Sequence, residues 1–328
     1  MSARSAFVTG ATGFFGRHMV EQLRAAGWEV TVFHRAGSST AQLARYEPRF
    51  AVGTLTDPSS VAAAMPEGVD AVFHVAANTS FWRGDQEQQF QDNVIGTRSV
   101  VEAALTKHAR CFIHTSSESA WGEPARKPLD EEVPMRGAES FIGYERTKYL
   151  AEQEVKAAIP RGLRAVIMNP AHILGRYDEH SWGRSFRLVK ARKLPGIPPG
   201  SGSWGWAEEI AKAHVAAVDR GVSGENYLLG GVDASYLEVF QEISRLVGVE
   251  VPTKTLPAWV LKPYAAAADF ASRFTRRAPD VTGELAHMLS DDRPVRSGKA
   301  IAALGFRATP IQQILKDCHD WLVAEGRL

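Results

Sequence analysis

The chain has 328 residues, more than a single hydrophobic core of roughly 250–300 residues usually holds, so we expect one large domain and a smaller lobe. Its 45% hydrophobic and 23% charged residues are typical of a soluble globular protein, and a net charge of +1 gives no reason to expect nucleic acid or a membrane as partner. Two cysteines without disulfide spacing, no room for a signal peptide and no apolar run of ~20 residues together predict a cytoplasmic protein.

The first half of the chain alternates short apolar runs with helical patterns. We expect strands, rich in Val, Ile and Phe, at Ala6–Thr9, Glu29–His34, Phe50–Val52, Ala71–Val75, Cys111–Thr115 and Arg164–Met168. Between them we expect helices at Phe15–Ala26, Ser59–Met65, Gln86–Lys107 and Gly143–Ala158. Asp57-Pro58 before the second helix and Gly27 after the first are the usual start and stop signals. This alternation predicts an α/β fold, a Rossmann-type doubly wound parallel sheet.

The pattern changes after about residue 175. Lys193–Ser203 is rich in Gly, Pro and Ser and predicts a loop. Beyond it we expect a short strand at Asn226–Leu229 that rejoins the sheet, and helices at Glu208–Arg220, Tyr236–Val247, Leu256–Phe274 and Ile311–Glu325. We therefore expect a Rossmann domain over 1–175, to which 205–235 return, and a smaller, mainly helical C-terminal substrate lobe over 176–204 and 236–328.

A glycine-rich turn, Phe7-Val-Thr-Gly-Ala-Thr-Gly-Phe-Phe-Gly16, joins the first strand to the first helix. Glycine lets the backbone turn tightly and approach a pyrophosphate, which then lies on the helix N-terminus. Gly10, Gly13 and Gly16 therefore predict a dinucleotide site. The second strand ends without the acidic residue that would hold the ribose 2′-hydroxyl of NAD, whereas Arg35 could pair with a 2′-phosphate. NADPH is favoured over NAD, and a solvated surface arginine is the alternative for Arg35.

Lys148 follows Tyr144 by four residues, so both lie on one face of the predicted helix. A nearby ammonium stabilises a phenolate and lowers its pKa, which would let Tyr144 act as a general acid towards a forming alcohol. The Tyr-x-x-x-Lys spacing is common by chance, so further motifs in the chain are needed to support this role for Tyr144.

Several further motifs occur in a characteristic order: His74-Val-Ala-Ala77, Asn93-Val-Ile-Gly-Thr97, Thr115-Ser-Ser117 with Gly122, and Asn169-Pro170. With the glycine-rich turn and the Tyr-Lys pair, they resemble the extended short-chain dehydrogenase/reductase family. The runs F-H-V-A-A-N, Y-E-R-T-K-Y-L-A-E, N-P-A-H-I-L-G and N-Y-L-L-G-G look most like its dihydroflavonol-4-reductase-like branch. The resemblance implies a catalytic set of Ser117, Tyr144 and Lys148. Ser117 would hydrogen-bond the substrate oxygen, Tyr144 would transfer the proton, and Lys148 would bind the nicotinamide ribose.

The resemblance also implies the cofactor contacts by position. They are Gly10, Thr12, Gly13, Phe14, Phe15, Gly16, Arg35, Thr54, Leu55, Ala76, Ala77, Asn78, Asn93, Thr115, Tyr144, Lys148, Pro170, Ala171 and His172. The chain departs from the family where Gly53-Thr54-Leu55 stands in place of Gly-Asp, so an adenine contact must come from Thr54 or from backbone. It departs again at Trp204–Glu209, where the family usually has valine–aspartate pairs.

Candidate substrate contacts are mostly aromatic. They are Phe81, Trp82, Glu118, Ser119, Phe141, His172, Trp182 and Phe186, with Trp121 and Trp204 as further aromatic candidates. Such a set favours an aromatic or alicyclic substrate over a polar sugar nucleotide, although aromatic residues are often ordinary core. The family's sugar-nucleotide dehydratases have an Asp-Glu pair where this chain has Glu118-Ser119. A dehydratase is therefore disfavoured, and Glu118 is expected to line the pocket or to be structural.

We expect an NADPH-dependent reductase that converts a ketone or aldehyde on a hydrophobic small molecule to an alcohol. An epimerase of sugar nucleotides that retains its NAD is one alternative, and a non-catalytic NADP-sensing regulator is another. The histidines show no H-x-x-x-H pair and the cysteines no C-x-x-C, so no metal is expected. By resemblance alone, a homodimer is expected to pack Gln86–Lys107 and Gly143–Ala158 into a four-helix bundle.

Overall fold

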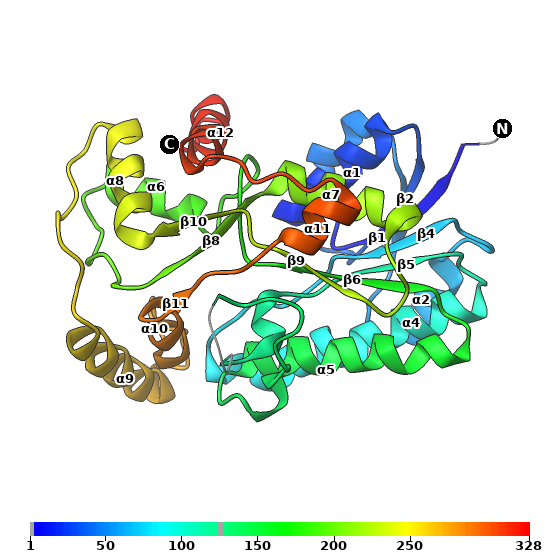
Figure 1. The fold of residues 1–328 in the computed structure, drawn as a ribbon, viewed down its shortest axis with the longest axis horizontal. Helices are drawn as coiled ribbons and strands as arrows, with labels where there is room; N and C mark the ends of the chain where they lie inside the picture. Colours follow the sequence, from blue (N-terminus) through cyan, green and yellow to red (C-terminus); the bar gives the residue numbers. More distant parts are fainter. Residues whose placement is uncertain (1–2, 124–127) are drawn as a thin grey trace.

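A seven-stranded parallel sheet forms the centre of the computed structural model, which describes residues 3–123 and 128–328 (Figure 1). Its strand order is β3-β2-β1-β4-β5-β6-β9. The strands are β1 (Ser5–Thr9), β2 (Glu29–His34), β3 (Arg49–Val52), β4 (Ala71–His74), β5 (Phe112–Thr115), β6 (Ala165–Pro170) and β9 (Asn226–Leu229). Every strand pair in this sheet is parallel, so the predicted Rossmann-type fold is confirmed.

Helices cover both faces of this sheet, as Figure 1 shows. One face packs against α1 (Phe14–Ala25), α7 (Ala207–Arg220) and α11 (Gly298–Leu304), and the other against α2 (Pro58–Ala64), α4 (Gly96–Thr106) and α5 (Gly143–Ala158). Successive strand residues point to opposite faces, so Val8 joins the first core and Phe7 the second. The inner strands β4, β5 and β6 are buried at every position, so their sequences are largely apolar, and this pattern made them predictable.

The helix expected over Gln86–Lys107 contains a local irregularity. It consists of α3 (Gln86–Phe90), a π-helical turn η3 (Gln91–Ile95) and α4. A π turn inserts an extra residue and rotates the side chains after it, and such turns often occur at functional sites. Hydrophobic spacing does not reveal a single inserted residue, so the sequence predicted one uninterrupted helix.

The C-terminal region contains a second, smaller sheet that the sequence analysis missed. It joins β7 (His172–Leu174), β8 (Ser201–Trp206), β10 (Val232–Ser235) and β11 (Asp292–Arg293) around β8. The sequence of β8, Ser-Gly-Ser-Trp-Gly-Trp, has no β-branched residue and begins within the predicted loop. Only its pairing with three distant segments makes it a strand.

Helices form the rest of this region, which is mainly helical as expected. They are α6 (Gly183–Lys190), α8 (Tyr236–Val247), α9 (Ala258–Thr275), α10 (Gly283–Leu289) and α12 (Ile311–Ala324). Short 3-10 turns elsewhere in the chain are η1 (Ala41–Tyr46), η2 (Arg83–Asp85), η4 (Glu118–Trp121), η5 (Gly137–Glu139) and η6 (Ile159–Arg161). Over the described residues, no helix combines the length and apolar character needed to cross a membrane.

Candidate active site

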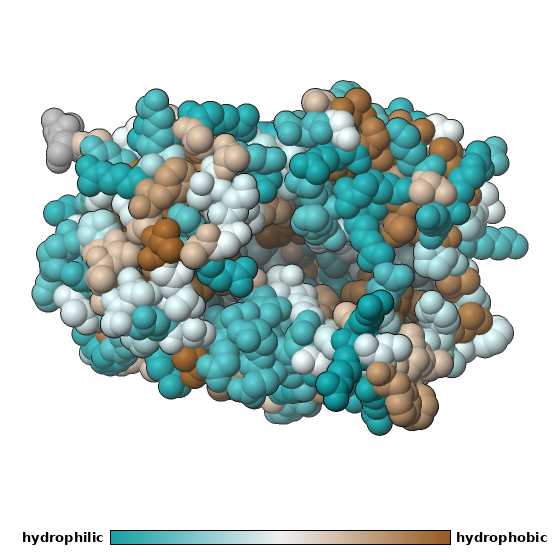
Figure 2. Space-filling model, turned by 180° about the vertical axis from the view of Figure 1, so that it is seen from behind, coloured by the Kyte–Doolittle hydropathy of each residue, from teal (hydrophilic) through white to brown (hydrophobic). Residues whose placement is uncertain are grey.

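A cleft of about 1480 Å³ lies between the carboxyl ends of the large sheet's strands and the C-terminal helices. Figure 2 shows the hollow near the middle of one face of the molecule. Segments after β1, β2, β4, β5 and β6 form one wall, and residues of α6, α8, α9 and α10 form the other. Ligands of open parallel sheets bind outside the carboxyl ends of the strands, so this is the expected place for a site.

The glycine-rich turn forms one end of the cleft. Gly10 has a φ of +71°, and a Cβ there would lie 2.5 Å from the backbone nitrogen of Ala76. A Cβ on Gly16 would lie 2.1 Å from the carbonyl oxygen of Gly10. Gly13 is the N-cap of α1 and has no side chain to cap it, so the first backbone N–H groups of the helix remain available. This bare helix start has the shape and polarity that a pyrophosphate requires.

The segment after β2 lines the part of the cleft where the sequence analysis places the adenosine of the cofactor, and we call this part the adenosine end. Arg35 lies there, exposed, where an acidic residue would be needed to hold a ribose 2′-hydroxyl. Ser38 and Ser39, which the sequence analysis did not select, line the cleft beside it. Thr54 also lines the cleft, and its hydroxyl oxygen lies 3.2 Å from that of Thr56. The hydroxyl is therefore already engaged with a neighbour.

Nearly all the residues predicted to bind a cofactor line this one cleft. Asn93 is the exception, since it is buried in the π turn. Its side-chain oxygen accepts a hydrogen bond of 2.7 Å from the backbone nitrogen of Asn78, and its amide donates one of 2.9 Å to the Asn78 carbonyl. The amide also lies 3.1 Å from the Thr147 hydroxyl. Asn93 thus holds the cleft-lining backbone at Asn78 and joins it to α5.

Ser117, Tyr144 and Lys148 line the floor of the cleft together. Ser117 directly follows β5, and its hydroxyl accepts a hydrogen bond of 3.2 Å from the backbone nitrogen of Ser119, starting η4. Tyr144 and Lys148 lie one turn apart at the start of α5. The Lys148 ammonium donates a hydrogen bond of 3.0 Å to the Thr115 carbonyl oxygen, which ties α5 to the end of β5.

The ionisation of the Tyr-Lys pair differs from the prediction. Burial raises the pKa of Tyr144 to about 12, although its hydrogen bond with Ser117 acts in the opposite direction. The expectation that Lys148 lowers this pKa was wrong for the structure described, because desolvation of the phenolate outweighs the other effects. Burial lowers the pKa of Lys148 to about 8, and the charge of Glu152 opposes that change. A phenol that stays protonated can donate a proton at neutral pH.

A buried polar network lies behind Ser117. Asn169 donates hydrogen bonds of 3.0 Å to the Ser117 carbonyl and 2.6 Å to a carboxylate oxygen of Glu152. Asn226 donates one of 2.9 Å to the other Glu152 oxygen. Glu152, fully buried on α5, therefore connects the loop of Ser117 with β6 and β9. The sequence analysis missed Glu152, although its position one turn after Lys148 on the predicted helix was a usable signal.

Glu118 lines the cleft beside Ser117 and is only 7% exposed. Burial raises the pKa of its carboxyl, while the charge of Arg293 acts in the opposite direction. Arg293, from β11, is itself buried and donates a hydrogen bond of 2.8 Å to Glu145 on α5. The Ser119 hydroxyl donates one of 3.1 Å to Glu118. The cleft thus carries a carboxyl group, poorly solvated, within reach of a bound ligand.

The structure brings only part of the predicted substrate set to the cleft. The members of that set that line the cleft are Phe81, Glu118, Ser119, His172 and Trp182.

Three of the predicted substrate contacts do not line the cleft. Phe186 is fully buried in the core between α6, α8 and α12. Phe141 is 50% exposed and packs against His287. The indole nitrogen of Trp82 lies 3.2 Å from the Ser272 hydroxyl, to which it donates a hydrogen bond. We leave these three out of the site, because packing elsewhere accounts for each of them.

An aromatic group surrounds His172 on the substrate side of the cleft. Its ring centroid lies 5.2 Å from that of Trp182 and 4.7 Å from that of Trp204, and its Nε2 lies 3.2 Å from the Tyr236 hydroxyl. Trp204 is fully buried, as is Trp121, so neither faces a ligand. Burial lowers the pKa of His172 to about 4, which keeps the ring neutral. Tyr236, which the sequence analysis missed, lines the cleft with Trp182.

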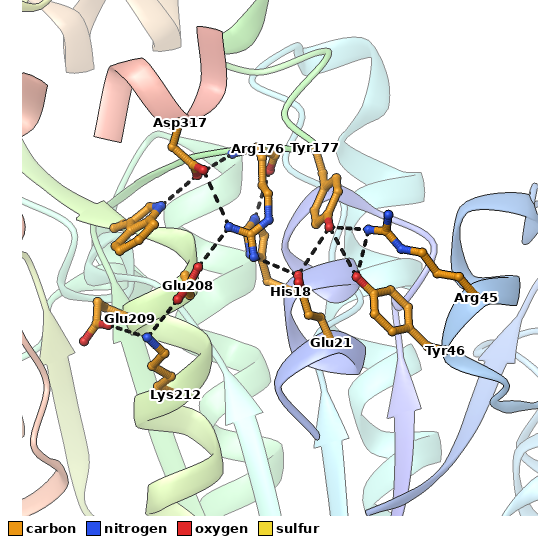
Figure 3. Close-up of polar contacts among 11 residues, drawn as sticks. His18, Glu21, Arg45, Tyr46, Arg176, Tyr177, Glu208, Glu209, Lys212 and Asp317 are labelled. Carbon is orange, nitrogen blue, oxygen red and sulfur yellow. Dashed lines mark hydrogen bonds and ion pairs between the residues drawn. The ribbon is translucent and has the colours of Figure 1, made fainter. Parts of the chain in front are cut away.

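An ion-pair cluster fixes the lobe against the Rossmann core (Figure 3). Arg176 lies 2.9 Å from Glu21 on α1, 2.9 Å from Glu208 on α7 and 3.5 Å from Asp317 on α12. Tyr177, which lines the cleft, has a φ of +71° and donates a hydrogen bond of 3.3 Å to Glu21. The cluster therefore holds a strained cleft residue where three helices meet. Among the described residues, no group of three or more potential metal ligands is arranged to bind an ion.

Comparisons with known proteins place this geometry in context. The model of the NAD dependent epimerase/dehydratase family matches residues 6–230. "Sterol demethylase protein B" of Methylococcus capsulatus is 30% identical, over 98% of this chain and 99% of its own. A "putative dihydroflavonol 4-reductase" of Synechocystis is 29% identical, over 98% and 95% of the two chains. The crystal structure of gox2253 superposes with a TM-score of 0.85 at 31% identity and covers 99% of each chain.

Proposed function

The chain belongs to the NAD dependent epimerase/dehydratase family, the extended short-chain dehydrogenases/reductases, and from this premise we propose that it is an NADPH-dependent carbonyl reductase. The observation that carries the proposal is the placement of Ser117, Tyr144 and Lys148 on the floor of the cleft that begins at Gly10 and Gly16. A proton donor beside a dinucleotide cradle is what the reduction of a carbonyl group requires.

The residues divide the reaction between them. NADPH, when bound, supplies the hydride that adds to the carbonyl carbon. The Ser117 hydroxyl donates a hydrogen bond to the carbonyl oxygen and so stabilises the negative charge that develops on it. The Tyr144 hydroxyl delivers the proton that completes the alcohol. Lys148, charged below a pKa of about 8, stabilises the tyrosinate that is left and holds the nicotinamide ribose.

Arg35 supports the choice of NADPH over NADH. Arg35 is exposed at the adenosine end of the cleft, and Ser38 and Ser39 line the same part of it. The described residues that line the cleft directly after β2 include no carboxylate to bind a ribose diol. Replacing Arg35 with Ser should weaken NADPH binding by about ten- to a hundredfold and leave NADH binding nearly unchanged, because the lost charge-assisted bond involves only the 2′-phosphate. Fluorescence titration with each cofactor measures this. Equal losses for both would contradict the assignment.

The substrate side of the cleft supports a hydrophobic, ring-containing substrate. Apolar and aromatic side chains contribute to its lining, among them Trp182, Tyr236, Phe240, Leu261, Leu285 and Met288. Relatives whose names refer to a sterol and to dihydroflavonol agree with a polycyclic carbonyl compound. A panel of steroid ketones, dihydroflavonols and short β-keto esters, scored by consumption of NADPH, should favour the first two. A preference for the β-keto esters would contradict this substrate class.

The replacement Tyr144→Phe tests the reaction. It should reduce turnover of the best ketone by at least about a thousandfold, because the phenol proton has no substitute, and leave the Kd for NADPH nearly unchanged. Tyr149→Phe is the matched control, since Tyr149 lies on the same helix outside the cleft lining. Full activity in Y144F, or a purified protein that carries NAD and does not exchange it, would refute the proposal. The second result would favour an epimerase.

A further inference from the structure

One face of α9 is apolar and exposed to solvent. The helix packs through Leu261, Ala265 and Ser272, which are buried, and its main partner is α10. On its other side are large apolar side chains with high exposure: Trp259 (77%), Phe274 (76%), Phe270 (59%), Tyr264 (58%) and Val260 (38%). Figure 1 shows α9 at an outer corner of the molecule, next to α10.

Helical spacing gathers these side chains into one continuous surface. Residues three, four, seven and eleven positions apart share a helix face, which places Trp259, Pro263, Phe270 and Phe274 in one row and Val260 and Tyr264 in the next. Ala266, Ala267 and Ala271 fill the space between the rows. The acidic residue of the helix, Asp269, is turned inward and accepts a hydrogen bond of 2.8 Å from the backbone nitrogen of Gly283. We call this surface of nine apolar residues the outer face of α9.

Basic side chains border the outer face. Lys262 and Arg273 lie along one edge, and Arg276 and Arg277 follow the end of the helix; all four are exposed. The Arg273 guanidinium carbon lies 5.9 Å from the centre of the Phe270 ring. The acidic residue beyond them, Asp280, forms an ion pair with Arg184. An apolar strip bordered by positive charge complements the surface of an anionic bilayer.

We propose that the outer face of α9 docks on an anionic phospholipid membrane surface. The helix lies in the plane of the interface, with its aromatic side chains among the acyl chains and its lysine and arginines at the phosphates. Such a helix does not cross the bilayer.

The docking helix also forms the rim of the cleft. Val260, Leu261 and Tyr264 line the cleft from α9, so docking would place its mouth at the lipid surface. A hydrophobic ligand could then pass from the bilayer into the cleft without crossing water. This proposal does not depend on the reaction proposed above, because vesicle binding requires neither cofactor nor turnover.

A second copy of the chain is a poorer occupant. A two-fold contact between two outer faces would bring the same basic edges towards each other, and like charges at such an interface are unfavourable. An anionic bilayer neutralises the same charges.

Co-sedimentation of the full chain with phosphatidylcholine vesicles, with and without phosphatidylserine, tests the proposal. We expect binding to the anionic vesicles, weakened by high salt, and at least about tenfold weaker binding to the neutral ones. Trp259→Ser with Phe274→Ser should weaken binding at least about tenfold, as should Lys262→Gln with Arg273→Gln. Ile301→Ser is the apolar control, since Ile301 is 49% exposed on α11, outside this face.

The outcomes separate the proposal from its rivals. Loss of binding in both double variants, with I301S unchanged and all melting temperatures preserved, supports it. Absence of binding to anionic vesicles, or equal binding by W259S/F274S, would overturn it. A dimer that the same double variant dissociates in analytical ultracentrifugation, without vesicle binding, would overturn it in favour of self-association.

Discussion

The titration of Lys148 should appear in the pH dependence of reduction. Its ammonium is buried, and the fall of its pKa from 10.5 to about 8 corresponds to about 3 kcal/mol in favour of the neutral amine. The active form is the charged one, so activity is present below pH 8 and lost above it. Lys148 is about 90% charged at pH 7 and about 10% charged at pH 9, so kcat/KM should fall about tenfold between them.

The fall of kcat/KM at high pH is the alkaline limb of the pH profile. Two replacements should move this limb in opposite directions along the pH axis. Lys148→Arg keeps its charge at all accessible pH values, so the limb should move above pH 9 even if the plateau is lower. Glu152→Gln removes the negative charge that raises the pKa of Lys148, so the limb should move below pH 8. Glu154→Gln is the matched control, because Glu154 lies on the same helix and pairs with Arg98 on the surface.

The assay is NADPH consumption with the best ketone of the panel, with kcat/KM measured across the alkaline range. This ratio reports the ionisation of the free enzyme, which is the state described by the structure. A limb that stays at the same pH in both K148R and E152Q would refute the reasoning, because Lys148 would then not be the titrating group.

Three further predictions concern the cradle, the core and the joint between the lobes. Gly16→Ala should abolish NADPH binding in a fluorescence titration, since its Cβ would lie 2.1 Å from the Gly10 carbonyl oxygen, and unchanged binding would contradict the cradle. Burial holds the pKa of His114 well below 6.5, so the folded protein loses stability as the pH falls below about 6.5. His114→Leu should reduce the loss in unfolding free energy between pH 7 and pH 5, and an equal loss in both proteins would refute this. Arg176→Met should lower the unfolding free energy by about 2–4 kcal/mol by leaving Glu21 and Asp317 without their cation, while Glu208 keeps its ion pair with Lys212. Arg4→Met, at an exposed pair, should change it by less than about 1 kcal/mol, and a similar effect of both replacements would contradict the role of the cluster.

Much of the large sheet could be predicted because its signals are local. Glu29–His34 and Asn226–Leu229 are apolar runs bounded by turn residues, and the structure has strands at these same residues. Asp57 caps α2, as its place before Pro58 predicted, and its side chain accepts a hydrogen bond from Ser59. The strand β8 could not be predicted, because its glycines and serines have no preference for a strand until β10 and β11 pair with it.

The candidate site also has features that could be predicted from the sequence and features that could not. The glycine-rich turn and the Tyr144–Lys148 spacing are contained in short stretches of chain, so the sequence shows them directly. Glu152 and Arg293 act through partners on other elements, and no pattern within a short stretch predicts which partner a buried charge will meet. The pKa of Tyr144 was mispredicted for the same reason, since desolvation depends on everything packed around the phenol.

The sequence by itself predicted a helix over Leu256–Phe274, which the structure has at Ala258–Thr275, and a glycine-rich turn between the first strand and the first helix. The tertiary structure alone decided that α9 packs through its Leu261 face and leaves Trp259 and Phe274 in solvent. Helix formation depends on residues within about one turn along the chain. Burial of a helix face depends on which distant elements of the chain pack against it. The net charge of +1 gave no reason to expect a membrane partner, because it is a sum over the whole chain. It carries no information on where the fold places basic and apolar side chains side by side, as it does on α9.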